Sequence, residues 1–247
     1  MRLFKYLMFL NVILLTGCNY TIKTPINSLT YPSASNGNKN SHNPSRLIIL
    51  LGGISTSVEY FEQHGWTEKL KQRYPEYSLV VPELHYGYIV KDIYSKRLYE
   101  DIILPAKQRG IQSIWLVGIS LGGLGAILTS DYSNNDIDRL YLLSPFLGNG
   151  AVQKQIRQVG SLKKWQAKST VGDTWEYKLW THIKDITESN TENIPIYMGY
   201  GKQDSMRGLK YLAAALPEKQ VISLSGGHKD AVFTMLFERM LELGFFD

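Results

Sequence analysis

The chain has 247 residues, of which 44% are hydrophobic and 20% are charged, so it can form one domain with a substantial core but is too short for two typical enzyme domains. Its formal net charge is +5, and setting aside Arg2 and Lys5 of the N-terminal segment leaves 25 basic against 22 acidic residues, a charge of +3. This balance is too weak to indicate a nucleic-acid partner, and no run of lysines and arginines is interleaved with aromatic residues.

The N-terminal segment has the order of an export signal. Arg2 and Lys5 precede an almost wholly apolar stretch over residues 7–15, and small residues then lead to Cys18, the only cysteine. The apolar stretch is too short for a stable membrane span. The sequence before Cys18 resembles the lipobox of bacterial lipoproteins, and this resemblance implies cleavage before Cys18 and acylation of its thiol. The alternative is an ordinary secretory signal or a plain membrane anchor.

These features predict a signal peptide over residues 1–17 and a lipoprotein held by its lipid at a membrane of the bacterial cell envelope, on the periplasmic or the surface side. With one cysteine, no internal disulfide can form. Residues 18–45 are predicted to comprise the lipidated Cys18 and a flexible tether without core elements. Their composition supports this, because residues 33–45 are dominated by Ser, Asn, Gly and Pro and can bury little surface.

From Arg46 onward, short apolar runs alternate with longer amphipathic segments, which is typical of parallel strands covered by helices on both faces. The predicted strands span residues 47–51, 78–81, 114–118, 140–143, 196–199 and 221–224. The predicted helices span residues 58–73, 92–108, 121–131, 206–216 and 230–243. The pattern predicts a three-layer α/β domain over residues 46–247, with a mostly parallel sheet of about six strands.

One connection is much longer than the others. Residues 146–193 lie between the fourth and fifth predicted strands, where a regular crossover needs only about a dozen residues. The segment contains Trp165, Trp175 and Trp180 and is predicted to form a small helical cap insert over the strand ends. Its tryptophans would either line a site for an acyl group or pack the insert onto the domain.

The clearest chemical motif is G-x-S-x-G, formed by Gly118, Ser120 and Gly122 between an apolar strand and a helix rich in small residues. This setting is typical of a nucleophile elbow, in which a strained turn presents the serine hydroxyl and the glycines avoid collisions with neighbouring elements. The alternative is a glycine-rich turn that packs tightly or cradles a phosphate.

A serine nucleophile needs a base and an acid that orients the base. His228 follows the last predicted strand and Asp204 follows the strand before it, so both are expected at the same edge of the sheet as Ser120. Asp204 could also cap a helix, and Asp230 could approach His228 from two residues away. The remaining histidines, whose positions favour surface or packing roles, are His42, His64, His85 and His182.

The order Ser120, Asp204, His228, with G-x-x-D after one strand and G-G-H after the next, resembles the serine hydrolases of the α/β-hydrolase superfamily over residues 46–247. This resemblance implies an oxyanion hole made by the N–H of Leu121 and an N–H of the loop after the first strand. We assign the second donor to Ile54, with Gly53 as its alternative. The loop departs from the family pattern, because Gly52 stands where histidine is usual.

The sequence predicts no metal site and no organic cofactor, because histidines and acids do not cluster at ligand spacing and no dinucleotide fingerprint is present. We expect a serine esterase that acts on a small-molecule acyl ester through an acyl-serine intermediate. The same triad serves thioesters and lysophospholipids, and a catalytically idle hydrolase fold that binds at the cell surface is a further alternative. The natural substrate and the oligomeric state do not follow from the sequence.

Overall fold

A computed structural model describes residues 21–34, 46–133, 135–167, 175–188 and 194–247. Within these ranges, seven strands form one sheet in the order β1-β3-β2-β4-β5-β6-β7. Strands β2 to β7 are parallel, and β1 pairs antiparallel to β3 at one edge. The strands are β1 Ser28–Tyr31, β2 Arg46–Leu51, β3 Tyr77–Pro82, β4 Ser113–Ile119, β5 Arg139–Leu143, β6 Ile196–Gly201 and β7 Val221–Leu224.

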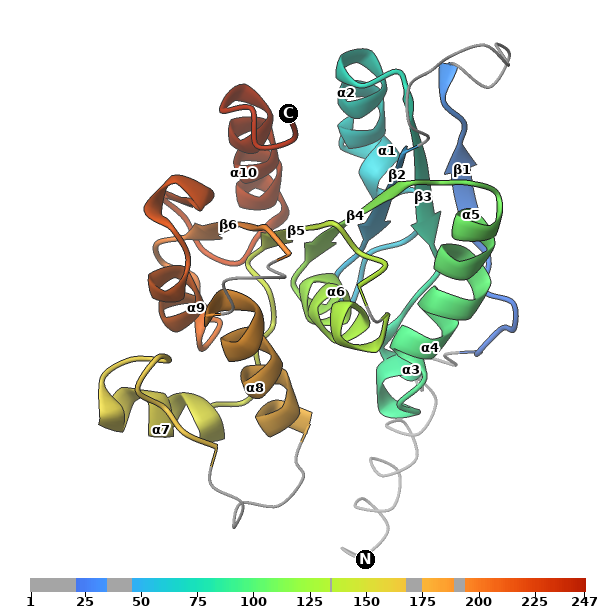
Figure 1. The fold of residues 1–247 in the computed structure, drawn as a ribbon. Helices are drawn as coiled ribbons and strands as arrows, with labels where there is room; N and C mark the ends of the chain where they lie inside the picture. The colour runs from blue at the N-terminus through green and yellow to red at the C-terminus, as the bar shows by residue number, and fades with distance from the viewer. Residues whose placement is uncertain (1–20, 35–45, 134, 168–174, 189–193) are drawn as a thin grey trace, which may run out of the picture.

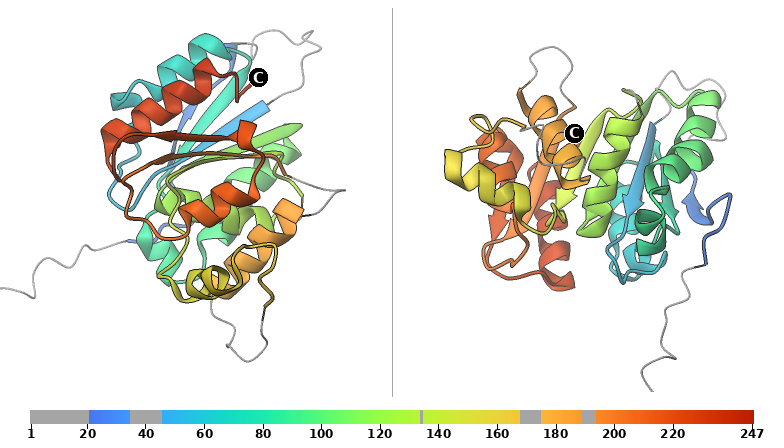
Figure 2. Two further views of the ribbon diagram at one scale, coloured as in Figure 1. Left: turned by 90° about the vertical axis from the view of Figure 1, so that its left-hand side faces the viewer. Right: turned by 90° about the horizontal axis from the view of Figure 1, so that it is seen from below.

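Helices cover both faces of this sheet (Figures 1 and 2). One face carries α3 Tyr86–Val90, α4 Tyr94–Leu98, a π-helical turn Tyr99–Ile103, α5 Leu104–Gln108, α6 Leu121–Tyr132, α7 Ala151–Val159, α8 Trp175–Glu188 and α9 Leu209–Ala215. The other face carries α1 Tyr60–Gln63, α2 Trp66–Arg73 and α10 Asp230–Glu242. A short 3₁₀ turn, Glu218–Gln220, precedes β7.

The central strands are continuous runs of apolar residues because each face of the sheet packs against its own core. In β2, Ile49 and Leu51 belong to one core, and Ile48 and Leu50 belong to the other. All four side chains are almost completely buried. The three-layer α/β prediction is therefore confirmed, and each of the six predicted strands is present.

The helices differ from prediction in two places. The helix expected over residues 58–73 is broken into α1 and α2 at Gly65, whose φ of +72° is a left-handed conformation that ends one helix before the next begins. The helix α3 was not predicted, since its five residues are too few to show a helical period; the side chain of His85 caps it by accepting the N–H of Gly87 at 3.1 Å.

The seventh strand corrects the expectation that residues 18–45 contain only a tether. Strand β1 pairs with β3 in the register Ser28 to Pro82 and Tyr31 to Leu79, and Ile26 is buried in the core. The strand is short and lies at the edge of the sheet, where backbone hydrogen bonds to β3 hold it. Because it has no apolar run, the sequence pattern did not reveal it. The folded domain thus includes residues before Arg46, whereas Cys18 lies outside the described residues.

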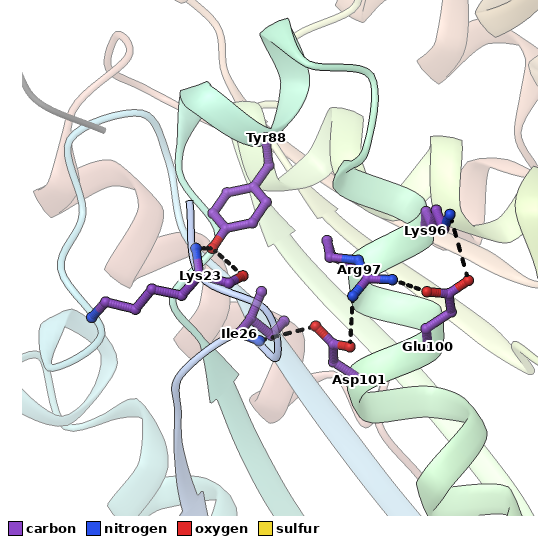
Figure 3. Close-up of polar contacts among 7 residues, drawn as sticks. All are labelled: Lys23, Ile26, Tyr88, Lys96, Arg97, Glu100 and Asp101. Atoms are coloured by element: carbon purple, nitrogen blue, oxygen red, sulfur yellow. Dashed lines mark hydrogen bonds and ion pairs between the residues drawn. The ribbon is translucent and has the colours of Figure 1, made fainter. Parts of the chain in front are cut away.

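Further contacts fix this N-terminal segment, which we define as residues 21–34 (Figure 3). The Tyr88 hydroxyl accepts the N–H of Lys23 at 2.8 Å and donates to its carbonyl at 3.1 Å. Asp101, buried beside Arg97, accepts the N–H of Ile26 at 2.9 Å. In the part of the chain that the structure describes, no helix is long and apolar enough to cross a membrane.

The described residues of the long connection form α7 and α8, which extend the helical layer beside α6. Trp165 and Trp180 are fully buried in the core of this layer, so these two side chains pack the insert onto the domain and do not wall a binding site. Trp175 differs, because it is 42% exposed and its ring lies 6.0 Å from that of Phe146.

Candidate active site

Ser120 occupies a tight turn between β4 and α6. Its backbone has φ +51° and ψ −110°, a conformation that non-glycine residues adopt only when the surroundings enforce it. The surroundings are the neighbouring strand and loop: the Ser120 N–H donates to the carbonyl of Leu143 at 3.0 Å, and its carbonyl accepts the N–H of Phe146 at 2.9 Å. The strained turn is therefore held from both sides.

The two motif glycines lie where a side chain has no room. A Cβ at Gly118 would lie 2.4 Å from the carbonyl oxygen of Gly122, and one at Gly122 would lie 2.1 Å from that of Leu51. Both obstacles are backbone atoms, which cannot rotate away. These glycines let α6 start directly against β4 and β2, and this close approach holds Ser120 beside the loop that follows β2.

Three side chains from distant parts of the sequence meet at the carboxyl edge of the sheet. The Ser120 Oγ lies 2.9 Å from Nε2 of His228, and Nδ1 of the same ring lies 2.9 Å from Oδ2 of Asp204. Ser120 follows β4, Asp204 follows β6 and His228 follows β7, so the parallel sheet aligns all three. The ring of Phe233 packs edge-on against His228 and restricts its orientation.

The Asp204 carboxylate is fully buried. Burial by itself would raise its pKa, but hydrogen bonds from the His228 ring and the Met206 N–H, together with the nearby Ser144 hydroxyl, outweigh burial and lower the pKa of Asp204 below its usual value. The Met206 N–H donates to Oδ1 at 2.8 Å. Asp204 does not cap a helix, because α9 begins at Leu209 after Gly208. One of its oxygens closes a local turn through the Met206 N–H, and the other orients His228.

Ser144 was missed by the sequence analysis. It follows β5, is completely buried, and has a φ of +45° that is rare outside glycine. Its Oγ makes no hydrogen bond of ordinary length and angle with the described residues, although the hydroxyl is close enough to Asp204 to lower the pKa of that carboxyl. The sequence signal that could have identified Ser144 is its position directly after β5, the strand next to β4, which leads into Ser120.

The alternative acid is occupied elsewhere, since Asp230 accepts a hydrogen bond from the Tyr60 hydroxyl at 3.2 Å. A second group of serine, histidine and aspartate lies on α6 and α8, where Nε2 of His182 is 2.9 Å from Oγ of Ser130 and Nδ1 is 3.3 Å from Asp131. There the serine hydroxyl donates to the carbonyl of Ile127 at 2.8 Å, so its proton is not directed to the histidine. Burial also lowers the pKa of His182, and the cluster serves packing.

His64 and His85 have local roles as well: Nδ1 of His64 lies 2.8 Å from the carbonyl of Tyr60, and His85 caps α3. His42 lies outside the described residues. Within the described ranges, no three histidine, cysteine or acidic side chains gather as metal ligands would.

The loop after β2 lies against Ser120. A Cβ added at Gly53 would lie 3.6 Å from the Cβ of Ser120, so the backbone of this loop passes directly beside the serine. Gly53 and Thr56 close a turn in which the Thr56 N–H and hydroxyl both bind the Gly53 carbonyl, and Ile54 stands at its tip, 51% exposed. Leu121 is the first residue of α6, where the backbone N–H has no acceptor within the helix.

The presence of glycine at position 52, where the α/β-hydrolase pattern usually has histidine, has a steric explanation. A Cβ at this position would lie 1.9 Å from the Thr56 Oγ1, so the turn that Thr56 closes occupies the space of a side chain. A side chain at position 52 would therefore need Thr56 to move and give up its hydroxyl contact with the Gly53 carbonyl.

A groove of about 780 Å³ opens beside this loop. It is lined by Gly52, Ile54 to Glu59, the end of β3 with the loop through His85, and also by Thr21 and Lys23 of the N-terminal segment. Its walls combine hydroxyls and charges of both signs with apolar side chains such as Phe61, Val81 and Leu84. The sequence analysis considered only the insert as a possible substrate wall and did not predict this groove, because a polar N-terminal segment carries no pattern that points to a groove.

No protein-family model matches the chain, and no curated protein matches it by sequence. Solved structures do. An S-formylglutathione hydrolase from Staphylococcus aureus superposes with a TM-score of 0.56 and 18% identity over 88% of this chain and 94% of that one. A fluorophosphonate-binding serine hydrolase from the same species gives 0.52 and 15% over 88% and 97%. A monoacylglycerol lipase from Paleococcus ferrophilus gives 0.53 and 12% over 89% and 99%.

These likenesses cover nearly the whole domain in each case. They show that the chain adopts the α/β-hydrolase fold, as the motifs predicted, with a seventh strand added to the predicted sheet. At such low identities they leave the activity to be argued from the site itself.

Proposed function

We propose that the protein is a serine hydrolase that cleaves carboxylic esters through an acyl-serine intermediate, with Ser120 as nucleophile, His228 as base and Asp204 as the acid that orients the base. The observation that supports this most is the unbroken chain of two 2.9 Å contacts from Ser120 through His228 to the buried Asp204. The solved structures of similar fold include hydrolases and lipases, which agrees with this activity.

In the first half of the reaction, Nε2 of His228 takes the proton of the Ser120 hydroxyl while Oγ attacks the carbonyl carbon of the ester. The oxyanion that forms accepts hydrogen bonds from the N–H groups of Leu121 and Ile54, and loss of one such donor typically raises the barrier by about 3 kcal/mol. The tetrahedral intermediate expels the alcohol, which takes the proton from His228 and leaves an acyl-serine.

In the second half, a water molecule gives its proton to His228 and attacks the acyl carbon. Collapse of the second intermediate returns the proton to Ser120 and releases the acid. Because the pKa of Asp204 is lowered, its carboxylate stays ionised at neutral pH and stabilises the imidazolium formed in each half.

We further propose that Cys18 carries lipid and holds the protein at a membrane of the bacterial cell envelope. The support is the order of charged, apolar and small residues before the only cysteine. The test is metabolic labelling with a fatty acid, in which the wild type should take up the label and Cys18→Ser should not. Label retained in Cys18→Ser would refute the lipid anchor.

The hydrolase proposal is tested by a fluorophosphonate probe, which should modify the wild type at Ser120 and leave Ser120→Ala unmodified. A panel of p-nitrophenyl esters and acyl thioesters then separates an esterase from a thioesterase of the same chemistry. An unreactive Ser120 in folded protein would favour the idle hydrolase fold that acts as a binding module at the cell surface.

A further inference from the structure

The N-terminal segment enters the fold at the candidate active site. Thr21 and Lys23 line the same groove as Gly52 and Ile54 of the loop beside Ser120. The segment cannot swing away freely, because Tyr88 binds both backbone polar groups of Lys23 and the buried Asp101 binds the N–H of Ile26 (Figure 3). The point at which the chain leaves the domain is thus next to the groove.

The chain between the predicted lipid and this point is short. Thr21 comes three residues after Cys18, and three extended residues span at most about 11 Å. A lipid on Cys18 would therefore hold the groove end of the domain close to the bilayer surface. The opposite end of the domain could not reach the bilayer while the lipid is inserted.

The surface at this end suits contact with lipid. Of the large hydrophobic side chains in the described residues, Val90 at the end of α3 is the most exposed at 63%, followed by Ile54 beside the groove at 51%; Tyr86 at the start of α3 is 41% exposed. Single exposed apolar residues are common, but these lie around the entry of a chain that is predicted to carry lipid. Lys91 and Asp92 follow Val90 and are both exposed, so zwitterionic or charged headgroups find a partner of either sign beside this apolar side chain.

We propose that the anchored protein rests with this end on the bilayer, with α3 in the interfacial layer and the groove open toward the membrane surface. The inference rests on the proposed lipid anchor and deepens the proposed esterase function. It assigns the substrate class: amphiphilic esters that partition into the membrane interface and reach Ser120 from the groove, whose walls carry both polar and apolar side chains.

Orientation is tested with dyes on two engineered cysteines, Val90→Cys and Leu243→Cys. Leu243 is 48% exposed and just precedes the C-terminus, where the Asp247 carbonyl binds Arg139 at the start of β5, so it lies at the opposite edge of the sheet. Acylated Cys18, verified by mass, has no free thiol. Each protein is reconstituted in vesicles of phosphatidylethanolamine and phosphatidylglycerol and labelled with an environment-sensitive dye. Lipids brominated in the acyl chain should quench the dye at residue 90 and leave that at residue 243 unquenched.

Substrate choice is tested with Val90→Glu and its matched control Leu243→Glu. Val90→Glu should lower hydrolysis of a long-chain ester embedded in vesicles about tenfold, since a charge replaces an apolar side chain at the interface. It should leave hydrolysis of a soluble acetate ester within about twofold, and Leu243→Glu should change neither rate.

The outcomes separate the two proposals. Equal quenching at both positions, or an equal loss of vesicle activity in both glutamate variants, would overturn the proposed orientation while soluble ester hydrolysis still supported the esterase. Absence of soluble ester hydrolysis with strong quenching at residue 90 would overturn the esterase and leave the orientation standing. Failure of the protein to float with vesicles would overturn the anchor and the orientation together.

Discussion

The contact between Asp101 and the N-terminal segment can be tested through stability. Asp101→Ala removes the acceptor of the buried Ile26 N–H and one of two carboxylate partners of Arg97, whose other partner is Glu100. An orphaned buried donor costs about 1–3 kcal/mol, and breaking a buried ion pair costs about 3–5 kcal/mol. Because Arg97 keeps Glu100, we expect a total of about 3 kcal/mol.

The matched control is Glu83→Ala, which removes two exposed contacts to the same segment, the ion pair with Lys23 and the hydrogen bond from the Asn27 side chain. Lys23 Nζ lies 3.2 Å from Glu83, but the two side chains are 46% and 44% exposed, so this pair should contribute less than about 1 kcal/mol. Urea unfolding followed by tryptophan fluorescence would measure the free energy of unfolding of both variants, and trypsin cleavage at Lys23 would detect local release of the segment. Equally small losses in both variants, with no added cleavage, would refute the role of the buried contact.

Four further predictions concern the site. Ser120→Ala and His228→Ala should each lose nearly all ester hydrolysis, while Asp204→Asn should retain somewhat more, because a wrong tautomer impairs the base without removing it. Gly122→Ala should lower kcat about 100-fold or more and reduce stability, because its Cβ would collide with the backbone of Leu51 and shift the loop beside Ser120. Trp175→Ala should change the preference between short and long acyl chains, seen as altered KM across an ester series, because this exposed ring contacts Phe146 beside the nucleophile. Stability should fall in acid through Asp204: its folded pKa is lowered, so its contribution is complete above the unfolded pKa of about 3.9 and is lost as pH falls through the folded value.

A specific result would contradict each of these four predictions. More than a few per cent of turnover in Ser120→Ala would reject the acyl-serine mechanism. Gly53→Ala is the control for Gly122→Ala, since its Cβ would make only an ordinary contact at 3.6 Å with the Ser120 Cβ; equal losses in both would reject the steric explanation. An unchanged chain-length profile in Trp175→Ala would remove Trp175 from substrate selection. Melting temperatures of wild type and Asp204→Asn that fall equally between pH 5 and pH 3 would reject the acid linkage.

Apolar runs and turn glycines predicted the three-layer α/β fold because they act locally, and the motifs around Ser120, Asp204 and His228 carried the resemblance to α/β-hydrolases. The strand before Ser120 and the helix after it follow from the residues themselves, and Gly118 and Gly122 mark where those elements must touch. The order of Ser120, Asp204 and His228 along the chain then placed all three at one edge, because parallel strands end on the same side of a sheet.

Other features depend on partners that are distant in sequence, and only the tertiary structure decided them. Strand β1 exists because the edge of β3 offers free hydrogen-bonding groups, and its own four residues show no apolar run. Ser144 lies beside Asp204 because β5 and β6 are neighbours in the sheet. Trp165 is buried between Gln155 of α7 and Tyr177 of α8, and Trp180 is buried against Leu147 and Gly208. Local chemistry sets the turn or strand in which a residue lies, whereas packing sets its neighbours across the fold. The positions of Ser120, Asp204 and His228 at the ends of their strands could therefore be predicted from the sequence, and the walls of the groove could not.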